Sequence, residues 1–577
     1  MSKPNILIIL VDELRYPVIY ESEEIKNFTK NLSAFAELEH TSLKLDKHYA
    51  ASTACSPSRT SLYTGQYPSL HGVSSTAGAG KDTYDPDMFW LDPQNIPTLG
   101  HMFMENGYDT YWVGKWHASA ADITTPGTHN ALASYNNDGS PNAEKIKIYL
   151  QADKLEPWGF KYWIGPEPHG PSPLNTGDSA KDATGRDVFY SEQAKRLLSK
   201  LSKENNDKPW LMVVSFVNPH DIAMYGLQSR LSGKFDFAVD PTVPQKIYSE
   251  LFNKTLNDDL NTKPSAQKSY QEVYKYWFPA INDANEYYRV YYNLQRKVNK
   301  QVQKVLDALK KYNHNKNTIT VCTSDHGDLL GSHGYMHQKW YNVYEESVHV
   351  PFYIRWPEKI KPTNVNVITS HIDVIPTLLG LAGININGQK WTKNFMNYQE
   401  LVGRDLSRLV LNPKLSGEYK YQPIFFMTDD DVTRGIAEND FLGLPPFSVE
   451  QPNHIYSVIT RLEGINGYWK FNYYFDNPQF WTKPGVEDDV VKTFKTNTLM
   501  EPLVAATRKV KTVPLPSEYE MYNLDDDPME LNNLANNKAY KNVRIILENI
   551  LKAECCKKRL TPLIAPVPGQ PLCKNIV

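Results

Sequence analysis

The stretch "NILIILVDE", residues 5–13, decides the fold of this chain. After Asn5 it is an unbroken apolar run, rich in β-branched residues, and it ends in two acids, Asp12 and Glu13. A strand with both faces buried has this pattern, because neither face needs alternating polar residues. The run therefore predicts a central strand of a parallel sheet, with two carboxylates at its carboxyl end.

Similar runs follow along the chain, separated by segments with helical periodicity. The predicted strands lie within residues 108–117, 209–221, 317–328 and 350–357. The predicted helices lie at 191–204, from about 283 to 311, and at 371–384. Strands that alternate with helices predict an α/β fold, in which a large, mixed but mostly parallel sheet is sandwiched by helices.

The character of the sequence changes near residue 415. Residues 456–475 predict an antiparallel hairpin that turns near Gly464 to Gly467, and residues 518–534 predict a short strand, an acidic turn and the start of a helix. We therefore expect a catalytic domain over 1–415 and a smaller C-terminal α+β subdomain over 416–577, with a small antiparallel sheet and a helix.

The composition excludes several classes of protein. The chain of 577 residues can bury a large core, and its net charge of −3 argues against nucleic acid or an anionic membrane as the main partner. Its five cysteines are an odd number, thinly spread, which does not indicate a disulfide framework. The apolar run at the amino terminus is too short for a signal peptide or a membrane span, so we expect a cytoplasmic protein. Nothing in the sequence sets the oligomeric state.

Ionisable residues follow three of the predicted strands, as the pairs Asp12-Glu13, His220-Asp221 and Asp325-His326. Open α/β sheets bind ligands outside the carboxyl ends of their strands. A single acid in such a place is usually a solvated loop residue, but three strand ends of this kind favour a site. Carboxylates suit hard divalent cations, and a His ligand shifts the preference towards Mn, Zn or Fe. The pattern leaves metal binding and an acid–base loop equally open.

Two further features suit the transfer of an anionic group. Lys115 and His117 in "GKWH" are two residues apart, so on an extended segment they point to one face, although a surface Lys and a packed His would give the same letters. In "CSPSRTSLYTG", residues 55–65, Pro57 can open a helix and Arg59 can reach back over its start. A thiol at Cys55 would then have a lowered pKa. His333 and His337 are better explained as loop residues.

The segment from Cys55 resembles the Cys-x-Pro-Ser-Arg signature of the type I sulfatases, which belong to the alkaline phosphatase superfamily. Other segments resemble the same family in the same order, and together they span most of residues 4–534. They are "PNILIILVDELR", "GYDTYWVGKWH", "NPHD", "TSDHGDLLGSHG", "KWYNVYEESVHVPFYIRWP", "SHIDVIPTLLGLAG" and "YNLDDDPMELNNL". The resemblance implies an alkaline phosphatase-like fold and hydrolysis of a sulfate ester to an alcohol and inorganic sulfate.

The resemblance also implies a role for each candidate residue. A maturation enzyme would convert Cys55 to formylglycine, whose hydrated aldehyde attacks sulfur, while Arg59 steadies it. His220 would protonate the leaving oxygen, and His117 would deprotonate the second hydroxyl so that sulfate is eliminated. Lys115, His117 and Lys339 would hold the sulfate oxygens. One divalent metal ion would be held by Asp12, Glu13, Asp325, His326 and the residue made from Cys55.

Two positions depart from the common family pattern, because many members have Asp in place of Glu13 and Asn in place of His326. The Asp-His pair also occurs in related phosphonate monoester and phosphodiester hydrolases, in which the Lys-x-His pair is replaced. Since "GKWH" is intact here, the sequence favours a sulfatase, with a phosphonate or phosphodiester hydrolase as the alternative and a binding protein with unmodified Cys55 as the third reading. The metal is expected to be Ca or Mn, with Mg less favoured. The ester could be a carbohydrate sulfate, an aryl sulfate or a choline-like sulfate.

Overall fold

A computed structural model of the chain describes residues 3–558, except for short gaps. The gaps are residues 78–80, 82, 84, 86–87, 121–131, 169–171, 205–207, 279–280, 282, 386–394, 397–399, 435–447 and 496–503. The main sheet has seven strands in the order β3-β4-β1-β5-β6-β2-β7 among the described residues. Its strands are β1 (Asn5–Val11), β2 (Leu43–Tyr49), β3 (Asp109–Gly114), β4 (Trp210–Phe216), β5 (Thr318–Thr323), β6 (Phe352–Arg355) and β7 (Thr363–Ser370).

The predicted mixed, mostly parallel sheet is confirmed. Strand β1 lies between β4 and β5 and pairs with both in parallel, and β4 and β5 are buried along their whole length. The run at 350–357 forms β6, which is antiparallel to both of its neighbours and shorter than predicted. Strands β2 and β7 were not predicted, because polar residues interrupt their apolar residues and the sequence there is similar to that of a loop.

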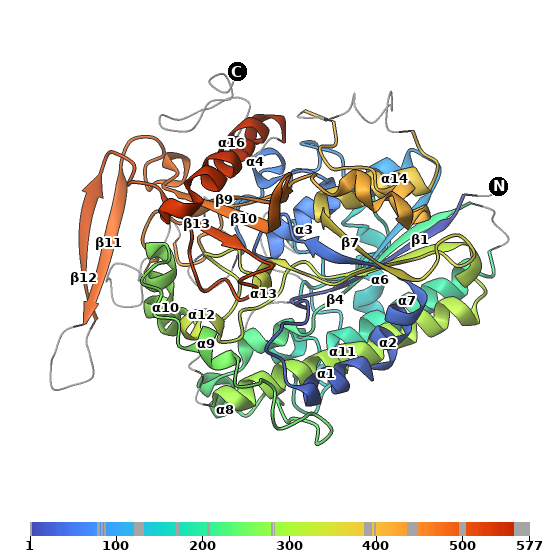
Figure 1. Ribbon diagram of the computed structural model, residues 1–577. Coiled ribbons are helices and arrows are strands. Elements are labelled where there is room, and N and C mark those ends of the chain that lie inside the picture. Colours follow the sequence, from blue (N-terminus) through green and yellow to red (C-terminus); the bar gives the residue numbers. More distant parts are fainter. Residues whose placement is uncertain are drawn as a thin grey trace.

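Helices cover both faces of the main sheet. In Figure 1, α3 and α14 lie above the sheet, and α2, α7 and α11 lie below it. The helices of these layers are α2 (Ser33–Thr41), α3 (Cys55–Thr64), α5 (Leu99–Met104), α7 (Arg186–Leu201), α11 (Ala284–Lys311) and α14 (Val374–Leu381). The long α11 packs against α2 and α7 with apolar side chains spaced three or four residues apart, while every residue of α3 is buried. Helix α3 therefore runs through the interior.

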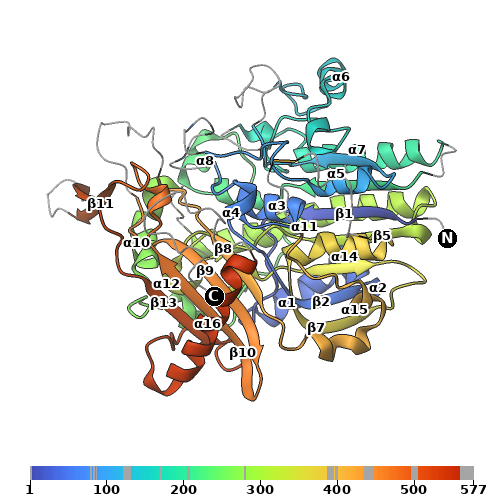
Figure 2. The same cartoon turned by 90° about the horizontal axis from the view of Figure 1, so that it is seen from above.

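A second, four-stranded antiparallel sheet follows in the order β13-β10-β9-β8. It is made of β8 (Ile424–Thr428), β9 (His454–Leu462), β10 (Ile465–Phe475) and β13 (Glu518–Asn523), and α16 (Lys541–Lys557) packs on it (Figure 2). The predicted hairpin is the β9–β10 pair. The predicted short strand is β13, but the predicted helix start within 518–534 is wrong, because turns follow β13 and α16 begins only at Lys541.

The remaining strands form a hairpin, β11 (Asp488–Lys495) with β12 (Val504–Lys511), which projects from the body in Figure 1. The proposed boundary at 415/416 falls inside the short 3₁₀ segment Pro413–Tyr419, which lies between the two sheets along the chain. Cys55, Cys322 and Cys555 are free and buried, while Cys573 lies outside the described residues. Among the described helices, none combines the length and apolarity needed to cross a bilayer.

A buried cation connects the second sheet to the body. Lys470 in β10 is fully buried, and its Nζ lies 2.9 Å from Glu345 Oε1 and 2.9 Å from Glu530 Oε1. The same ammonium donates to the carbonyl oxygen of Val343 at 2.7 Å. Val343 and Glu345 belong to the segment that follows β5, so this ion pair network crosses between the two parts of the chain.

Replacing Lys470 by Met should lower the free energy of unfolding by about 3–5 kcal/mol, because two buried carboxylates lose their counter-charge. Urea denaturation of the full chain measures the change. The control is Lys552→Met in α16, whose side chain is 63% exposed and pairs with Glu548; this variant should keep the wild-type midpoint. An unchanged midpoint for Lys470→Met would contradict the assigned role.

Candidate active site

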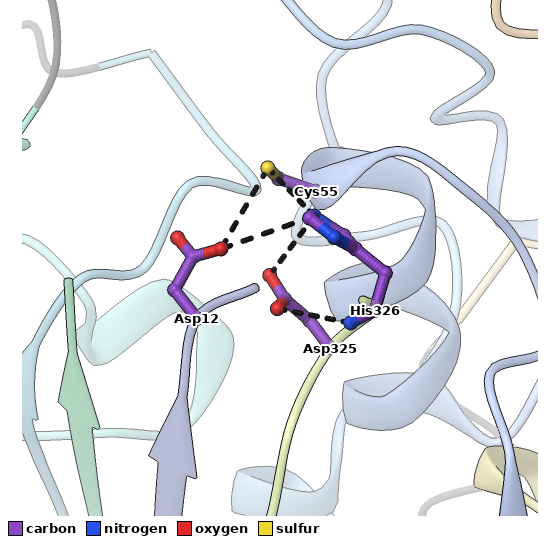
Figure 3. A group of neighbouring side chains, drawn as sticks. All are labelled: Asp12, Cys55, Asp325 and His326. Carbon is purple, nitrogen blue, oxygen red and sulfur yellow. Dashed lines mark hydrogen bonds and ion pairs between the residues drawn. The ribbon is translucent and has the colours of Figure 1, made fainter. Parts of the chain in front are cut away.

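Four of the predicted site residues meet at the carboxyl edge of the two central strands. Asp12 follows β1 and Asp325 follows β5, and since these strands are parallel neighbours, both carboxylates emerge at the same edge. Figure 3 shows them facing Cys55, at the start of α3, and His326. One ligand atom from each of the four lies within 4.8 Å of the others, and all four residues are buried.

Backbone hydrogen bonds fix the geometry of this edge. Asp325 Oδ1 accepts the N–H of Glu13 at 3.1 Å and that of His326 at 3.0 Å. His326 Nδ1 lies 3.0 Å from the carbonyl oxygen of Gly327, which can only accept, so Nδ1 carries the proton. His326 Nε2 therefore presents its lone pair to the cluster, 3.0 Å from Cys55 Sγ.

Arg59 joins the two aspartates. Its Nε donates to Asp325 Oδ2 at 2.7 Å, and its Nη2 lies 3.1 Å from Asp12 Oδ2. Lys115 Nζ also donates to Asp12 Oδ2, and all four side chains have no exposed surface. Burial alone would raise the pKa of Asp12, but Lys115 and Arg59 hold it well below its usual value, so Asp12 is a carboxylate.

Glu13 differs from Asp12 and Asp325 in its partner, because it pairs with Lys339. It has a left-handed backbone conformation, φ 66°, and its Oε1 lies 3.1 Å from Lys339 Nζ. Burial raises the pKa of Glu13 well above its usual value, and Asp328 adds to the rise while Lys339 opposes it. Glu13 is not part of the group of four found among the described residues. Its expected role as a metal ligand stays a prediction.

The expected lowering of the Cys55 pKa is wrong. Burial raises the pKa of this thiol to about 11, and the Asp12 carboxylate adds to the rise, although Lys339 and Lys115 oppose it. Arg59 was expected to stabilise a thiolate, but its guanidinium is engaged by the carboxylates of Asp12 and Asp325. Cys55 in this site is a neutral thiol, which makes it a poor nucleophile in its unmodified form.

The donor set fits a divalent cation. Two carboxylates and one imidazole converge with the side chain of Cys55, and Asp12 and Asp325 bring hard oxygen ligands. The imidazole lone pair of His326 is already oriented by Gly327, as in sites where a second hydrogen bond fixes a His ligand. Carboxylate oxygens suit Mg, Ca or Mn, and an imidazole nitrogen shifts the preference of a site towards Mn, Zn or Fe.

Lys115 and His117 lie just beyond the end of β3. The extended conformation ends at Gly114, and His117 has a left-handed φ of 56°, so the same-face argument from the sequence does not hold. Glu167 instead fixes this segment by accepting the N–H of His117 at 2.9 Å and that of Trp116 at 3.2 Å. Burial raises the pKa of Glu167 to about 7, although the hydrogen bond from the His117 N–H lowers this pKa.

His220 begins a short 3₁₀ turn, His220–Met224, which follows β4 after three intervening residues. Burial and Lys115 lower its pKa well below the usual value, with Asp12 opposing, so its imidazole is neutral and in the field of the cluster. Asp187 holds the end of β4 by accepting the N–H of Val217 at 2.7 Å and that of Asn218 at 3.0 Å.

The sequence did not point to Glu167 or Asp187, because each acts on backbone N–H groups far away in sequence and belongs to no motif. His333 and His337 lie outside the group of four. His333 stacks on Tyr344 with ring centroids 3.5 Å apart, and its Nε2 lies 3.4 Å from Glu346 Oε2, so it serves packing. Burial lowers the pKa of His337 to about 4.

Comparison with known proteins agrees with this arrangement. The sequence model of the family named "Sulfatase" matches residues 4–384. The chain is 26% identical over 387 residues to "Uncharacterized sulfatase YidJ" of Escherichia coli (strain K12), covering 67% of this chain and 69% of that protein. It is also 26% identical over 435 residues to the choline-sulfatase of Rhizobium meliloti (strain 1021), covering 73% and 76% of the two chains.

Solved structures share the fold. A 2-O GAG sulfatase superposes with a TM-score of 0.60 at 19% identity, covering 100% of both chains. The phosphonate monoester hydrolase of Agrobacterium radiobacter superposes with a TM-score of 0.57 at 18% identity, covering 99% of this chain and 100% of the other. Because the family match covers well over half of the chain and includes all four clustered residues, this protein belongs to the sulfatase family and is a sulfuric ester hydrolase.

Proposed function

We propose that this chain hydrolyses a sulfate ester at the edge formed by Asp12, Cys55, Asp325 and His326, using formylglycine made from Cys55 and one divalent cation, Ca or Mn. The observation that carries the proposal is the convergence of these four side chains with Arg59, Lys115 and Lys339, which gives metal donors and anion-binding cations in one buried place. The substrate is a carbohydrate sulfate or a small sulfate such as choline sulfate, in line with the names of the similar proteins.

The absent groups would supply the nucleophile and the positive charge. Asp12, Asp325, His326 and the modified Cys55 would hold the cation, and Glu13 is a further candidate ligand on the same loop. The formylglycine hydrate supplies an oxygen nucleophile and a second hydroxyl, and the cation supplies Lewis acidity. Arg59 contacts both Asp12 and Asp325, and its positive charge helps to lower the pKa of Asp12.

The cationic side chains bind and orient the substrate. Lys115 Nζ forms an ion pair with Asp12, and Lys339 Nζ forms one with Glu13. We assign them, with His117, to the sulfate oxygens, where fixed positive charge stabilises the charge that develops during transfer. The attraction between a lysine or arginine and an anion is stronger in a site without water, because water does not screen the charges.

We assign His220 as the general acid that protonates the leaving oxygen. We assign His117 as the general base that accepts the proton from the second hydroxyl. Burial is the main cause of the lowered pKa of His220 and Lys115 is the second, so a bound sulfate beside Lys115 would remove only part of the lowering. A general acid works best when its pKa lies near the working pH.

The close alternative is a phosphonate monoester or phosphodiester hydrolase, which the Asp325-His326 pair and the likeness to the Agrobacterium radiobacter fold favour. Parallel kinetics separate the two. In protein produced together with a formylglycine-generating enzyme, kcat/KM for 4-nitrophenyl sulfate should exceed that for 4-nitrophenyl phenylphosphonate. A clear preference for the phosphonate would overturn the proposed substrate class.

Cys55→Ala should abolish turnover, because it removes the nucleophile precursor, and should leave the unfolding midpoint near that of wild type. Steady-state kinetics and thermal unfolding measure both quantities. The matched control is Cys322→Ala, since Cys322 is equally buried but lies in the core of β5; this variant should keep its activity. Mass spectrometry of the peptide 49–65 reports the aldehyde. A free thiol in active protein would reject the formylglycine proposal.

His220→Ala should slow substrates with poor leaving groups by about 10²–10³-fold, because general acid catalysis is worth that much when the leaving oxygen needs a proton. Hydrolysis of 4-nitrophenyl sulfate, whose leaving group needs little protonation, should fall far less. A series of aryl sulfates with graded leaving-group pKa measures the difference. Equal losses across the series would reject His220 as the acid.

A further inference from the structure

The end of β8 and the loop that follows it, in the C-terminal part of the chain, contact the segment that precedes Cys55. The N–H of Met427 donates to the carbonyl oxygen of Ala51 at 3.1 Å, and Thr428 Oγ1 donates to that of Thr53 at 2.5 Å. The last two residues of β8 therefore contact Ala51 and Thr53, in the segment that leads into α3. The nucleophile's segment is held from a part of the sequence more than 370 residues away.

Asp430 completes this contact. Its Oδ2 accepts the N–H of Ala54 at 3.0 Å, and its Oδ1 accepts the N–H of Thr76 at 3.1 Å. Oδ2 also accepts the indole N–H of Trp340 at 3.1 Å. The side chain is buried, with 4% of its surface exposed. Burying a carboxylate is costly unless donors satisfy it, and here three donors from three separate segments do so.

Two of these donors adjoin a residue of the site, and the third contacts the first turn of α3. Ala54 immediately precedes Cys55, and Trp340 immediately follows Lys339. Thr76 Oγ1 in turn accepts the N–H of Ser56, in the first turn of α3. One carboxylate thus contacts both the residue before Cys55 and the residue after Lys339.

We propose that Asp430 is a positioning residue that sets the distance between the Cys55 side chain and the Lys339 ammonium. The catalytic part of the inference rests on the proposed function, while the tether itself concerns only the chain. Asp430 is not one of the four clustered residues, and in this proposal it acts through Ala54 and Trp340.

The two neighbouring aspartates provide matched controls. Asp429 and Asp431 are buried to a similar degree, 7% exposed each, but they bind other partners. Asp429 Oδ1 lies 2.7 Å from His454 Nδ1, and Asp431 Oδ1 accepts the hydroxyl of Tyr341 at 2.6 Å. A purely structural role would make the three positions equivalent, because each loses a buried carboxylate.

The first experiment measures alkylation of Cys55 by iodoacetamide in the full chain made without a maturation enzyme, with Cys322 as the internal reference. Asp430→Ala should speed labelling of Cys55 by about tenfold or more, since the hydrogen bonds that close this segment are lost. Labelling of Cys322 should not change, and Asp430→Asn, which keeps one acceptor oxygen, should fall between. Asp429→Asn and Asp431→Asn should match wild type. Equal acceleration at both cysteines, or none at Cys55, would overturn the proposal.

The second experiment measures kcat and KM for 4-nitrophenyl sulfate in the converted protein. Asp430→Ala should lose about 10²-fold, mainly in kcat, because a small displacement of reacting groups has an effect of that size. The two control variants should stay within about threefold of wild type, as expected for residues that hold no reacting group. Active wild type with equal losses in all three variants would reject the positioning role. Wild type without sulfatase activity would reject the proposed function, while the labelling result would still test the tether.

Discussion

The guanidinium of Arg59, buried between Asp12 and Asp325, is the interaction on which the rest of the site depends. Two parallel strands that end in acids at one edge bring like charges together, and such charges cannot both remain ionised in a dry interior without compensation. Arg59 supplies it from within α3, the helix that also begins with Cys55. Placing the nucleophile precursor and the compensating cation on one rigid helix, four residues apart, fixes the first relative to the second.

The same principle extends outward in pairs of opposite charge. Lys115 stands on Asp12 and Lys339 on Glu13, so the acids and the cations of the edge balance before any ligand arrives. In the proposed function, a bound dication would pair with the carboxylates, and a bound sulfate would pair with the ammonium groups that those carboxylates release. No charge would then be left unpaired. Positioning residues such as Glu167 and Asp187 then hold backbone N–H groups, so that the charged side chains keep their direction.

Much of this could be predicted from the sequence, because burial leaves a strong pattern. The apolar runs of β1, β4 and β5 and the acids at their ends identified the central strands and the edge at which Asp12 and Asp325 meet. The half-polar strands β2 and β7 gave no such signal. The pKa of Cys55 was predicted with the wrong sign, because spacing places Arg59 near the thiol but does not show that two carboxylates have already engaged it. Asp430 could not be found, since its partners are backbone and indole donors in three distant segments.

The burial of α3 has a consequence for the biosynthesis of the protein. All ten residues of this helix are enclosed, and Cys55 has 1% of its surface exposed. If Cys55 is converted to formylglycine, as we propose, the converting enzyme would have to reach it before α3 is enclosed. Under this proposal, modification and folding would compete for the same segment, and the yield of active protein would depend on which is faster. Chains that fold first would be stable, correctly shaped and permanently inactive.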